Sequence, residues 1–137
     1  MLFRSRDRPQ LTIELNGGLH SLDDCTDHLG AVDGTMVGRA AYDHPLRWAA
    51  VDAALFGDTS HGQPKASTVV RGLLPYAERW LSRGDRLWPI ARHLVHVVEG
   101  VSGARAWRQQ LTQAAGQRDA KADVLEAAAQ QLEAQGY

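Results

Sequence analysis

The 137-residue chain has little cysteine and no long apolar run. Cys25 is its only cysteine, so no disulfide can form within the chain and a metal site built from several cysteines is excluded. No stretch approaches the ~18 apolar residues that a membrane-spanning helix needs. Residues 1–8 are largely polar and hold no apolar segment of the signal-peptide kind. These absences predict a soluble, cytoplasmic protein without a membrane partner.

A strong excess of charge is absent as well. The formal net charge is −1, which gives no overall indication of nucleic-acid or membrane binding. With 44% hydrophobic and 23% charged residues, the composition is that of a globular protein. The length suits one ordinary domain or two small ones.

The first part of the chain alternates strand-like and helix-like patterns. Leu11 to Leu15 alternates in the period-2 manner of a strand, and Ser21 is a suitable N-cap for a helix that follows. A second strand is predicted over residues 33–37 and a second helix from Pro45 to about Phe56. This order predicts two βα units in series, which form parallel sheets. Two parallel strands make no stable sheet alone, so the pattern requires more strands than the chain supplies.

The second part of the chain has helical periodicity throughout. We predict a domain over residues 1–58, a linker over 59–65 and a helical domain over 66–137. Pro75 should kink or divide the first helix of that domain. The expected fold is mixed α/β and mostly helical, with the βα units followed by a four-helix bundle. Its four apolar stripes lie within residues 66–81, 87–98, 104–114 and 124–132.

Glycine-rich loops follow both predicted strands. Asn16, Gly17 and Gly18 follow the first strand, and Gly38 and Arg39 follow the second. In a (β/α)₈ barrel, the loops after the last two strands frequently bind phosphate. Glycine lets backbone amides approach an anion, and arginine can add a bidentate hydrogen bond. The alternative is that both are simply tight βα turns.

Arginine is concentrated in the helical part of the chain. Six arginines lie between Arg79 and Arg108, against the acids Asp85 and Glu99. Arg105 and Arg108 are three residues apart and share one side of a predicted helix. This arrangement suits a nucleic-acid backbone, whose neutralised phosphates release counterions. A solvated helix face is the alternative.

Other reactive residues favour structural interpretations. Cys25 lies in a predicted helix beside Asp24 and Asp27, which disfavour a thiolate, so we expect it to pack rather than react. His93 and His96 could share a metal ion, but a core or surface role fits them better. We therefore assign no catalytic residue and no metal ligand.

Several segments together resemble one family, the bacterial tRNA-dihydrouridine synthases, and in particular their A-type branch. The resemblance covers most of the chain and is to the C-terminal portion of the family only. The segments that carry it are LTIELNGGL at 11–19, DGTMVGRAAYDHP at 33–45, VDAALFGD at 51–58, PYAERWLSRG at 75–84, ARH at 91–93 and GARAWR at 103–108.

The resemblance implies a fold and binding partners. Residues 1–58 would be the last two βα units of a (β/α)₈ (TIM) barrel that binds FMN, and residues 66–137 would be a tRNA-binding helical domain. The FMN phosphate would lie on the two glycine loops, and tRNA on two arginines of the GARAWR segment. The matching positions are Asn16, Gly17, Gly18, Gly38 and Arg39 for FMN, and Arg105 and Arg108 for tRNA.

The family reaction reduces uridine to 5,6-dihydrouridine in tRNA, with NADPH reducing the FMN. The cysteine that serves as acid, and the lysine and histidine that contact the flavin, come from earlier barrel strands and have no counterpart here. Cys25 follows the seventh strand and cannot be that acid. We therefore expect a C-terminal portion that holds one end of FMN and does not catalyse alone. The alternatives are a stand-alone RNA-binding or protein-interaction module, and a split enzyme with a separate barrel half or self-association.

Overall fold

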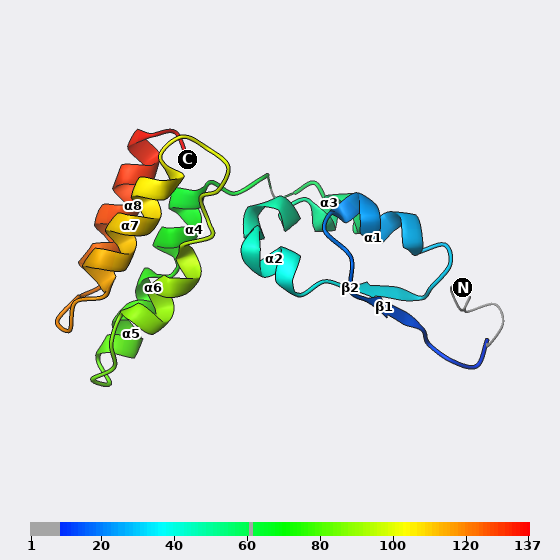
Figure 1. The fold of residues 1–137 in the computed structure, drawn as a ribbon, viewed down its shortest axis with the longest axis horizontal. Helices are drawn as coiled ribbons and strands as arrows, with labels where there is room; N and C mark the ends of the chain where they lie inside the picture. The colour runs from blue at the N-terminus through cyan, green and yellow to red at the C-terminus, as the bar shows by residue number, and fades with distance from the viewer. Residues whose placement is uncertain (1–8, 61) are drawn as a thin grey trace. The chain divides into compact units, whose positions relative to one another are not determined.

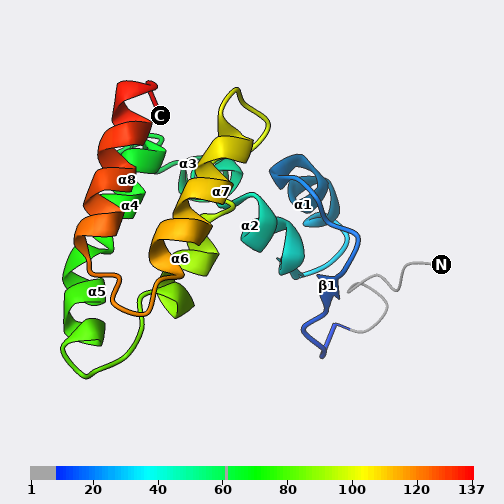
Figure 2. The same cartoon turned by 60° about the vertical axis from the view of Figure 1, so that its left-hand side comes forward.

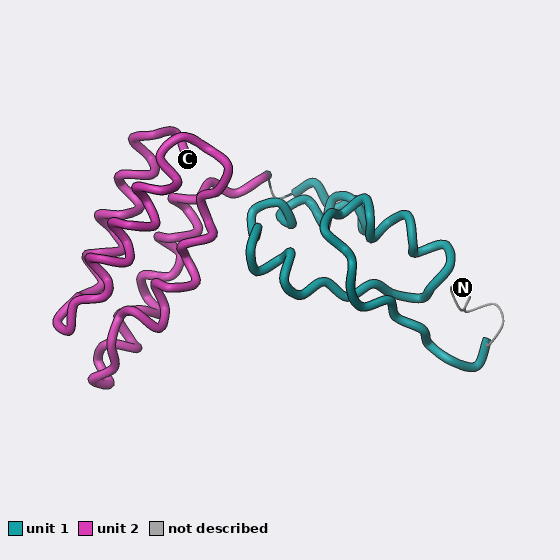
Figure 3. The backbone as a smooth tube through the Cα atoms, viewed as in Figure 1, with its two compact units in different colours: residues 1–62 teal, residues 63–137 magenta. Residues whose placement is uncertain are grey.

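The computed structural model describes residues 9–60 and 62–137. The chain divides into two compact units, residues 1–62 (unit 1) and residues 63–137 (unit 2) (Figure 3). Residues 1–8, which we expect to be polar and without a signal segment, and His61 of the predicted linker lie outside the described residues.

Unit 1 contains a small parallel sheet. Strand β1 (Glu14–Asn16) pairs with β2 (Gly34–Met36), and Asn16 stands opposite Met36. Both strands are shorter than the predicted 11–15 and 33–37. At the entrance to the pair, the Ile13 N–H donates to the Asp33 carboxylate at 2.9 Å instead of to a backbone carbonyl. The side chain thus takes the place of a backbone partner at the start of the sheet.

Helix α1 (Leu22–His28) begins where the sequence predicts. The Ser21 hydroxyl accepts a hydrogen bond from the Asp24 N–H at 3.0 Å, and the Asp24 carboxylate accepts one from the Ser21 N–H at 3.0 Å. This reciprocal capping box satisfies two backbone donors of the first turn. Figure 1 shows α1 returning alongside the two strands.

The helix predicted from Pro45 to Phe56 is wrong in detail. The chain instead forms α2 (Arg39–Asp43), a 3₁₀ helix η2 (Pro45–Trp48) and α3 (Val51–Phe56). A residue before proline avoids the helical region. His44 accordingly has φ −135° and ψ 56°, which separates α2 from η2. Gly57 ends α3 in the left-handed region at φ 69°.

Unit 2 is helical throughout its described part, which contains five helices rather than the predicted four. Pro75 divides the first stripe, as predicted, because it fits only the first turn of a helix. Helix α8 contacts both α4 and α7. Figure 1 shows α7 and α8 side by side, and Figure 2 shows α4 beside α8. The helices are α4 (Ala66–Gly72), α5 (Leu74–Leu81), α6 (Trp88–Leu94), α7 (Ala104–Ala115) and α8 (Asp123–Ala134).

The core of unit 2 lies between these helices. Leu87, Leu125, Leu132 and Val70 are its largest fully buried side chains. The buried Ser67 hydroxyl donates to the backbone oxygen of Tyr137 at 2.7 Å, which ties the start of α4 to the segment after α8. On the surface, α4 and α8 are also joined by an ion pair network.

That network centres on Arg71 of α4. Its guanidinium lies 2.7 Å from a carboxylate oxygen of Glu133 and 3.3 Å from one of Glu126. The hydrogen bond from Arg71 lowers the pKa of Glu133 below its ordinary value. Both acids belong to α8, so the charges and the core hold the same two helices together.

The protein is therefore mixed α/β and mostly helical, as predicted, with one parallel two-stranded sheet in its described part. Membership of that sheet in a (β/α)₈ barrel stays a prediction, as does the assignment of the domains to FMN and tRNA. None of the helices within residues 9–60 and 62–137 has the length and apolar character needed to cross a bilayer.

Candidate functional sites

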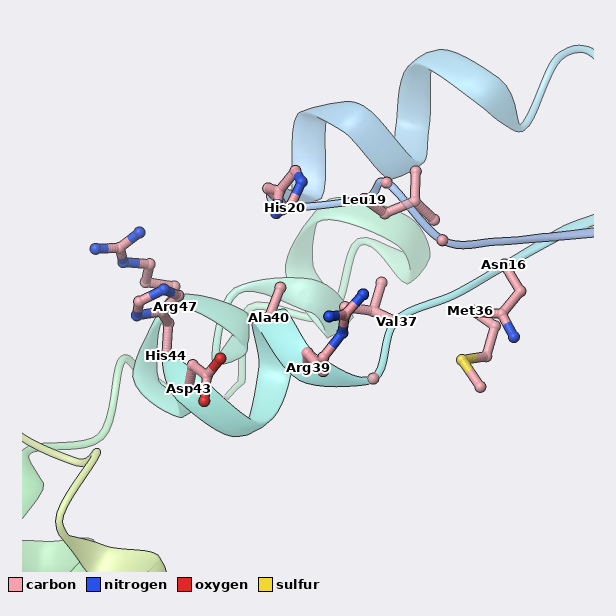
Figure 4. Close-up of a pocket in the computed structure, with 13 residues that line it drawn as sticks. Asn16, Leu19, His20, Met36, Val37, Arg39, Ala40, Asp43, His44 and Arg47 are labelled. Atoms are coloured by element: carbon pink, nitrogen blue, oxygen red, sulfur yellow. The ribbon is translucent and has the colours of Figure 1, made fainter.

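A cavity of about 490 Å³ lies at the carboxyl ends of the two strands in unit 1. Because Asn16 stands opposite Met36 in the parallel register, the loops that follow β1 and β2 leave the sheet at the same level. The cavity is lined by all five residues that the sequence assigns to a phosphate: Asn16, Gly17, Gly18, Gly38 and Arg39. Figure 4 shows Asn16 and Met36 together at one end of the cavity and Arg39 near its middle.

The first glycine loop leaves its backbone open to close approach by a ligand. Gly17 and Gly18 have φ values of 107° and 73°, which side chains with a Cβ rarely adopt. A Cβ placed on either glycine would meet no atom within 4 Å, so packing does not demand glycine there. The backbone conformation demands it, and the space beside both glycines stays open toward the cavity.

The end of the same loop is held by Asp24. Its carboxylate accepts hydrogen bonds from the backbone N–H groups of His20 at 2.8 Å and Ser21 at 3.0 Å. The bond from His20, followed by those from Ser21, lowers the pKa of Asp24 below its ordinary value. The Asp24 carboxylate therefore stays ionised at neutral pH and fixes where the loop joins α1.

Positive charge outweighs negative charge around the cavity. Arg39 is exposed, and in residues 9–60 and 62–137 no ion pair involves it. The sequence does not predict four polar or charged residues that also line the cavity: His20, Asp43, His44 and Arg47. His20 lies two residues after the glycines, and the other three follow Arg39 within two helical turns, which is the signal that could have indicated them. Asp43 is the only acid among the lining residues.

A second candidate surface lies on α7 in unit 2. Arg105 and Arg108 are exposed and border an open concavity of about 630 Å³ together with Gln109, Thr112 and Gln113. These positions recur at three- and four-residue steps, so they share one face of the helix. The α7 sequence contains no acid, and the surface is therefore cationic and rich in hydrogen-bond donors.

The opposite side of α7 anchors the helix. Trp107 is 3% exposed, and its indole N–H donates to the Leu94 carbonyl at 3.2 Å. Arg105 and Arg108 lie on either side of Trp107 in the sequence. Because the buried Trp107 fixes the orientation of α7, both arginines lie on its exposed face. The six arginines of the region do not share one role, because Arg86 donates to the Gly116 carbonyl at 2.9 Å.

The remaining reactive residues form no further site. Cys25 is 3% exposed within α1, which agrees with the predicted packing role. Among the described residues, no three or more histidine, cysteine or acidic side chains come together in a way that could hold a metal ion.

Comparison with known proteins places both candidate sites inside one family match. The family described as dihydrouridine synthase (Dus) matches residues 5–133. A tRNA-dihydrouridine(20/20a) synthase of Salmonella typhi is 48% identical over 124 residues, which are 90% of this chain and 37% of that protein. The Escherichia coli K12 protein of the same name is 45% identical over 122 residues, 88% of this chain and 35% of that protein. The chain thus spans a little over a third of the length of these relatives.

Proposed function

The chain belongs to the dihydrouridine synthase family, and from this premise we propose that it is the C-terminal portion of a tRNA-dihydrouridine synthase. The observation that carries the proposal is a single family match that spans both the glycine-lined cavity and the α7 arginine face. The whole enzyme would use FMN and NADPH and act in the cytoplasm on tRNA.

The unit 1 cavity fits the phosphate end of FMN. The open backbone at Gly17 and Gly18 admits an anion, and the Arg39 guanidinium can form a bidentate hydrogen bond with phosphate. Asn16 and Gly38 complete the loops on either side. When bound, FMN supplies the hydride that saturates the uridine ring, while this chain's residues bind and orient its phosphate.

No residue of this chain is assigned to proton transfer. Cys25 is buried within α1 and does not line the cavity. The flavin ring would have to be held by protein beyond these two βα units. We propose that this chain alone binds FMN weakly and does not catalyse.

The tRNA would be bound by unit 2. Arg105 and Arg108 project from one face of α7, and arginine forms charge-assisted hydrogen bonds with phosphates in nucleic acids. The absence of acids from α7 favours the approach of a polyanion.

The FMN half of the proposal is tested by titrating ¹⁵N-labelled chain with FMN and with riboflavin, which lacks the phosphate. FMN should shift the amide signals of Gly17, Gly18 and Arg39 with weak affinity, and riboflavin should leave them unchanged. Arg39→Gln should reduce the shifts, while Arg92→Gln, an exposed arginine of unit 2, should not. Stoichiometric flavin in the purified chain, or equal shifts with riboflavin, would contradict the proposal.

A stand-alone RNA-binding or protein-interaction module is the second candidate. What favours it is that unit 2 has a hydrophobic core of its own, so it can present the α7 face without the barrel. This candidate expects RNA binding by unit 2 and no response of unit 1 to FMN. A split enzyme, or self-association, would instead cover apolar side chains that unit 1 exposes, such as Leu11, Met36 and Phe56.

A further inference from the structure

Helix α5 presents a second cationic surface on which two aromatic rings are stacked. Tyr76, Arg79, Trp80 and Arg83 follow each other at steps of three, one and three residues, so they share one face of the helical turns. The turns continue past Leu81, because the Arg83 N–H donates to the Trp80 carbonyl at 3.2 Å. Ala77, on another side of α5, is fully buried.

The aromatic pair is fixed in place. The ring centroids of Tyr76 and Trp80 are 6.2 Å apart, and the ring planes make an angle of 27°. The Trp80 indole N–H donates to the Arg86 carbonyl at 3.0 Å, which holds the indole against the loop that follows α5. Tyr76 nevertheless remains 46% exposed. The Tyr76 ring is therefore accessible to solvent and is supported by the fixed Trp80 indole.

The charges beside the rings indicate the chemistry of the partner. Arg79 and Arg83 are both exposed, and among the described residues neither takes part in an ion pair. The nearby acids are Glu78, on another side of α5, and Asp85, in the following loop. An exposed aromatic face flanked by arginines matches an unpaired nucleotide, whose base stacks on the ring and whose phosphates meet the guanidinium groups.

We propose that the α5 face formed by Tyr76, Arg79, Trp80 and Arg83 binds unpaired nucleotides of the RNA substrate by stacking on Tyr76. This inference rests on the proposed function, because it takes RNA as the ligand of unit 2. It adds a contact of a different kind from the α7 arginine face. The α7 face would contact only the phosphates of the RNA. The α5 face would in addition need an unpaired base that can stack on Tyr76.

The test measures binding of labelled unmodified tRNA to the full chain by fluorescence anisotropy at several salt concentrations. Stacking on an aromatic side chain changes affinity by about 5- to 150-fold per base. Tyr76→Ala should therefore weaken binding within that range and leave the salt dependence unchanged. Tyr76→Phe keeps the ring and should bind as the parent chain does.

The arginines of the same face should respond differently. Arg79→Gln and Arg83→Gln should each lower the slope of log affinity against log salt by roughly 1, because each removes about one phosphate contact. A single-stranded oligonucleotide should compete for the part of the affinity that depends on Tyr76, and a fully paired RNA duplex should not. Circular dichroism of each variant checks that the fold is unchanged.

Two controls separate failure of this inference from failure of the proposed function. Tyr42→Ala removes a ring that is 47% exposed in unit 1 and should leave tRNA affinity unchanged. The double variant Arg105→Gln/Arg108→Gln reports on the α7 face. If the parent chain binds no tRNA, or the double variant binds as well as the parent, the tRNA assignment of the α7 face is wrong. If the double variant loses affinity and Tyr76→Ala does not, only the α5 inference is overturned.

Discussion

The two units of the chain differ in how much apolar surface they bury. Unit 2 surrounds a continuous core that includes Leu87, Leu125 and Leu132. The buried apolar residues of unit 1, within the part that the structure describes, are Leu19, Cys25, Val32 and Ala40. Most of the exposed large apolar side chains also belong to unit 1: Leu11, Leu29, Met36, Tyr42, Leu55 and Phe56. Unit 2 thus resembles a complete small domain, and unit 1 resembles part of a larger one.

The two units also differ in the hydrogen bonds of their tryptophan side chains. In unit 2, the indole N–H groups of Trp80 and Trp107 donate to backbone carbonyls. In unit 1, the indole nitrogen of Trp48 is buried and has no hydrogen-bond partner among the described residues. An unpaired buried donor costs about 1–3 kcal/mol. Burial of apolar side chains can offset this cost in a domain with a large core. Unit 1 buries few apolar side chains in its described part, so it offsets the cost poorly.

The largest expected effect tests whether the core of unit 2 carries the stability of the chain. Leu125→Ala removes a fully buried side chain and should lower the free energy of unfolding of unit 2 by about 2–5 kcal/mol. Phe56→Ala, at a side chain that is 79% exposed, should change stability by less than about 0.5 kcal/mol. Urea unfolding followed by circular dichroism measures both. Similar effects at the two sites would remove the contrast between the units.

A smaller effect is expected where unit 2 buries a polar group. Ser67→Ala leaves the backbone oxygen of Tyr137 without the hydroxyl that lies 2.7 Å from it, and should cost about 1–2 kcal/mol. Ser82 offers a matched control, because its hydroxyl also donates to a backbone carbonyl but is exposed. Ser82→Ala should be close to neutral in the same urea experiment. A neutral Ser67→Ala would mean that the hydrogen bond of the Ser67 hydroxyl adds nothing to the stability of unit 2.

The smallest effect is a pH dependence on the surface of unit 2. The pKa of Glu133 is lower in the folded protein than its ordinary value of 4.5, because Arg71 donates a hydrogen bond to it. Its stabilisation is therefore complete above pH 4.5 and is lost as the pH falls through the lower folded value. Arg71→Gln should destabilise unit 2 slightly at pH 7 and have no further effect at strongly acidic pH.

Unit 1 provides the control for this titration. The pKa of Asp24 is also lowered, by hydrogen bonds within the α1 cap. Asp24→Asn should therefore weaken the acid dependence of unit 1 and leave that of unit 2 unchanged, as read from amide signals of the two units. If the stability of unit 2 depends on pH in the Arg71→Gln variant as it does in the parent, the ion pair contributes nothing measurable to that stability.

The predictable parts of the fold are those that the local sequence determines. Ser21 and Asp24 specify the start of α1 because the cap is completed within four residues. Pro75 divides α4 from α5 because its ring is incompatible with a helix interior. The strand limits were not predictable in this way. The Asp33 carboxylate, twenty residues away, accepts the Ile13 N–H where the pairing begins, and periodicity carries no information about this contact.

The sequence predicts the glycine loops that line the cavity, but it does not predict the lining residues within segment 43–47. Gly17, Gly18 and Arg39 follow the strands directly, so their convergence follows from a parallel sheet. His44 and Arg47 reach the cavity only because α2 forms and the chain turns before Pro45. The sequence predicts a loop there, followed by one helix from Pro45, and this pattern does not place the two side chains at the cavity.

The buried Trp107 has a consequence for the energetics of the proposed RNA recognition. Its ring and its hydrogen bond to Leu94 fix the first turns of α7 before any ligand arrives. In the proposed complex, binding would restrict only the side chains of Arg105 and Arg108, at about 0.5–1.5 kcal/mol each, and not the backbone that carries them. On a flexible arm, the same two arginines would lose backbone entropy as well. The buried indole would thus strengthen the proposed arginine contacts, although it takes no part in them, because it removes backbone disorder that those contacts would otherwise have to overcome.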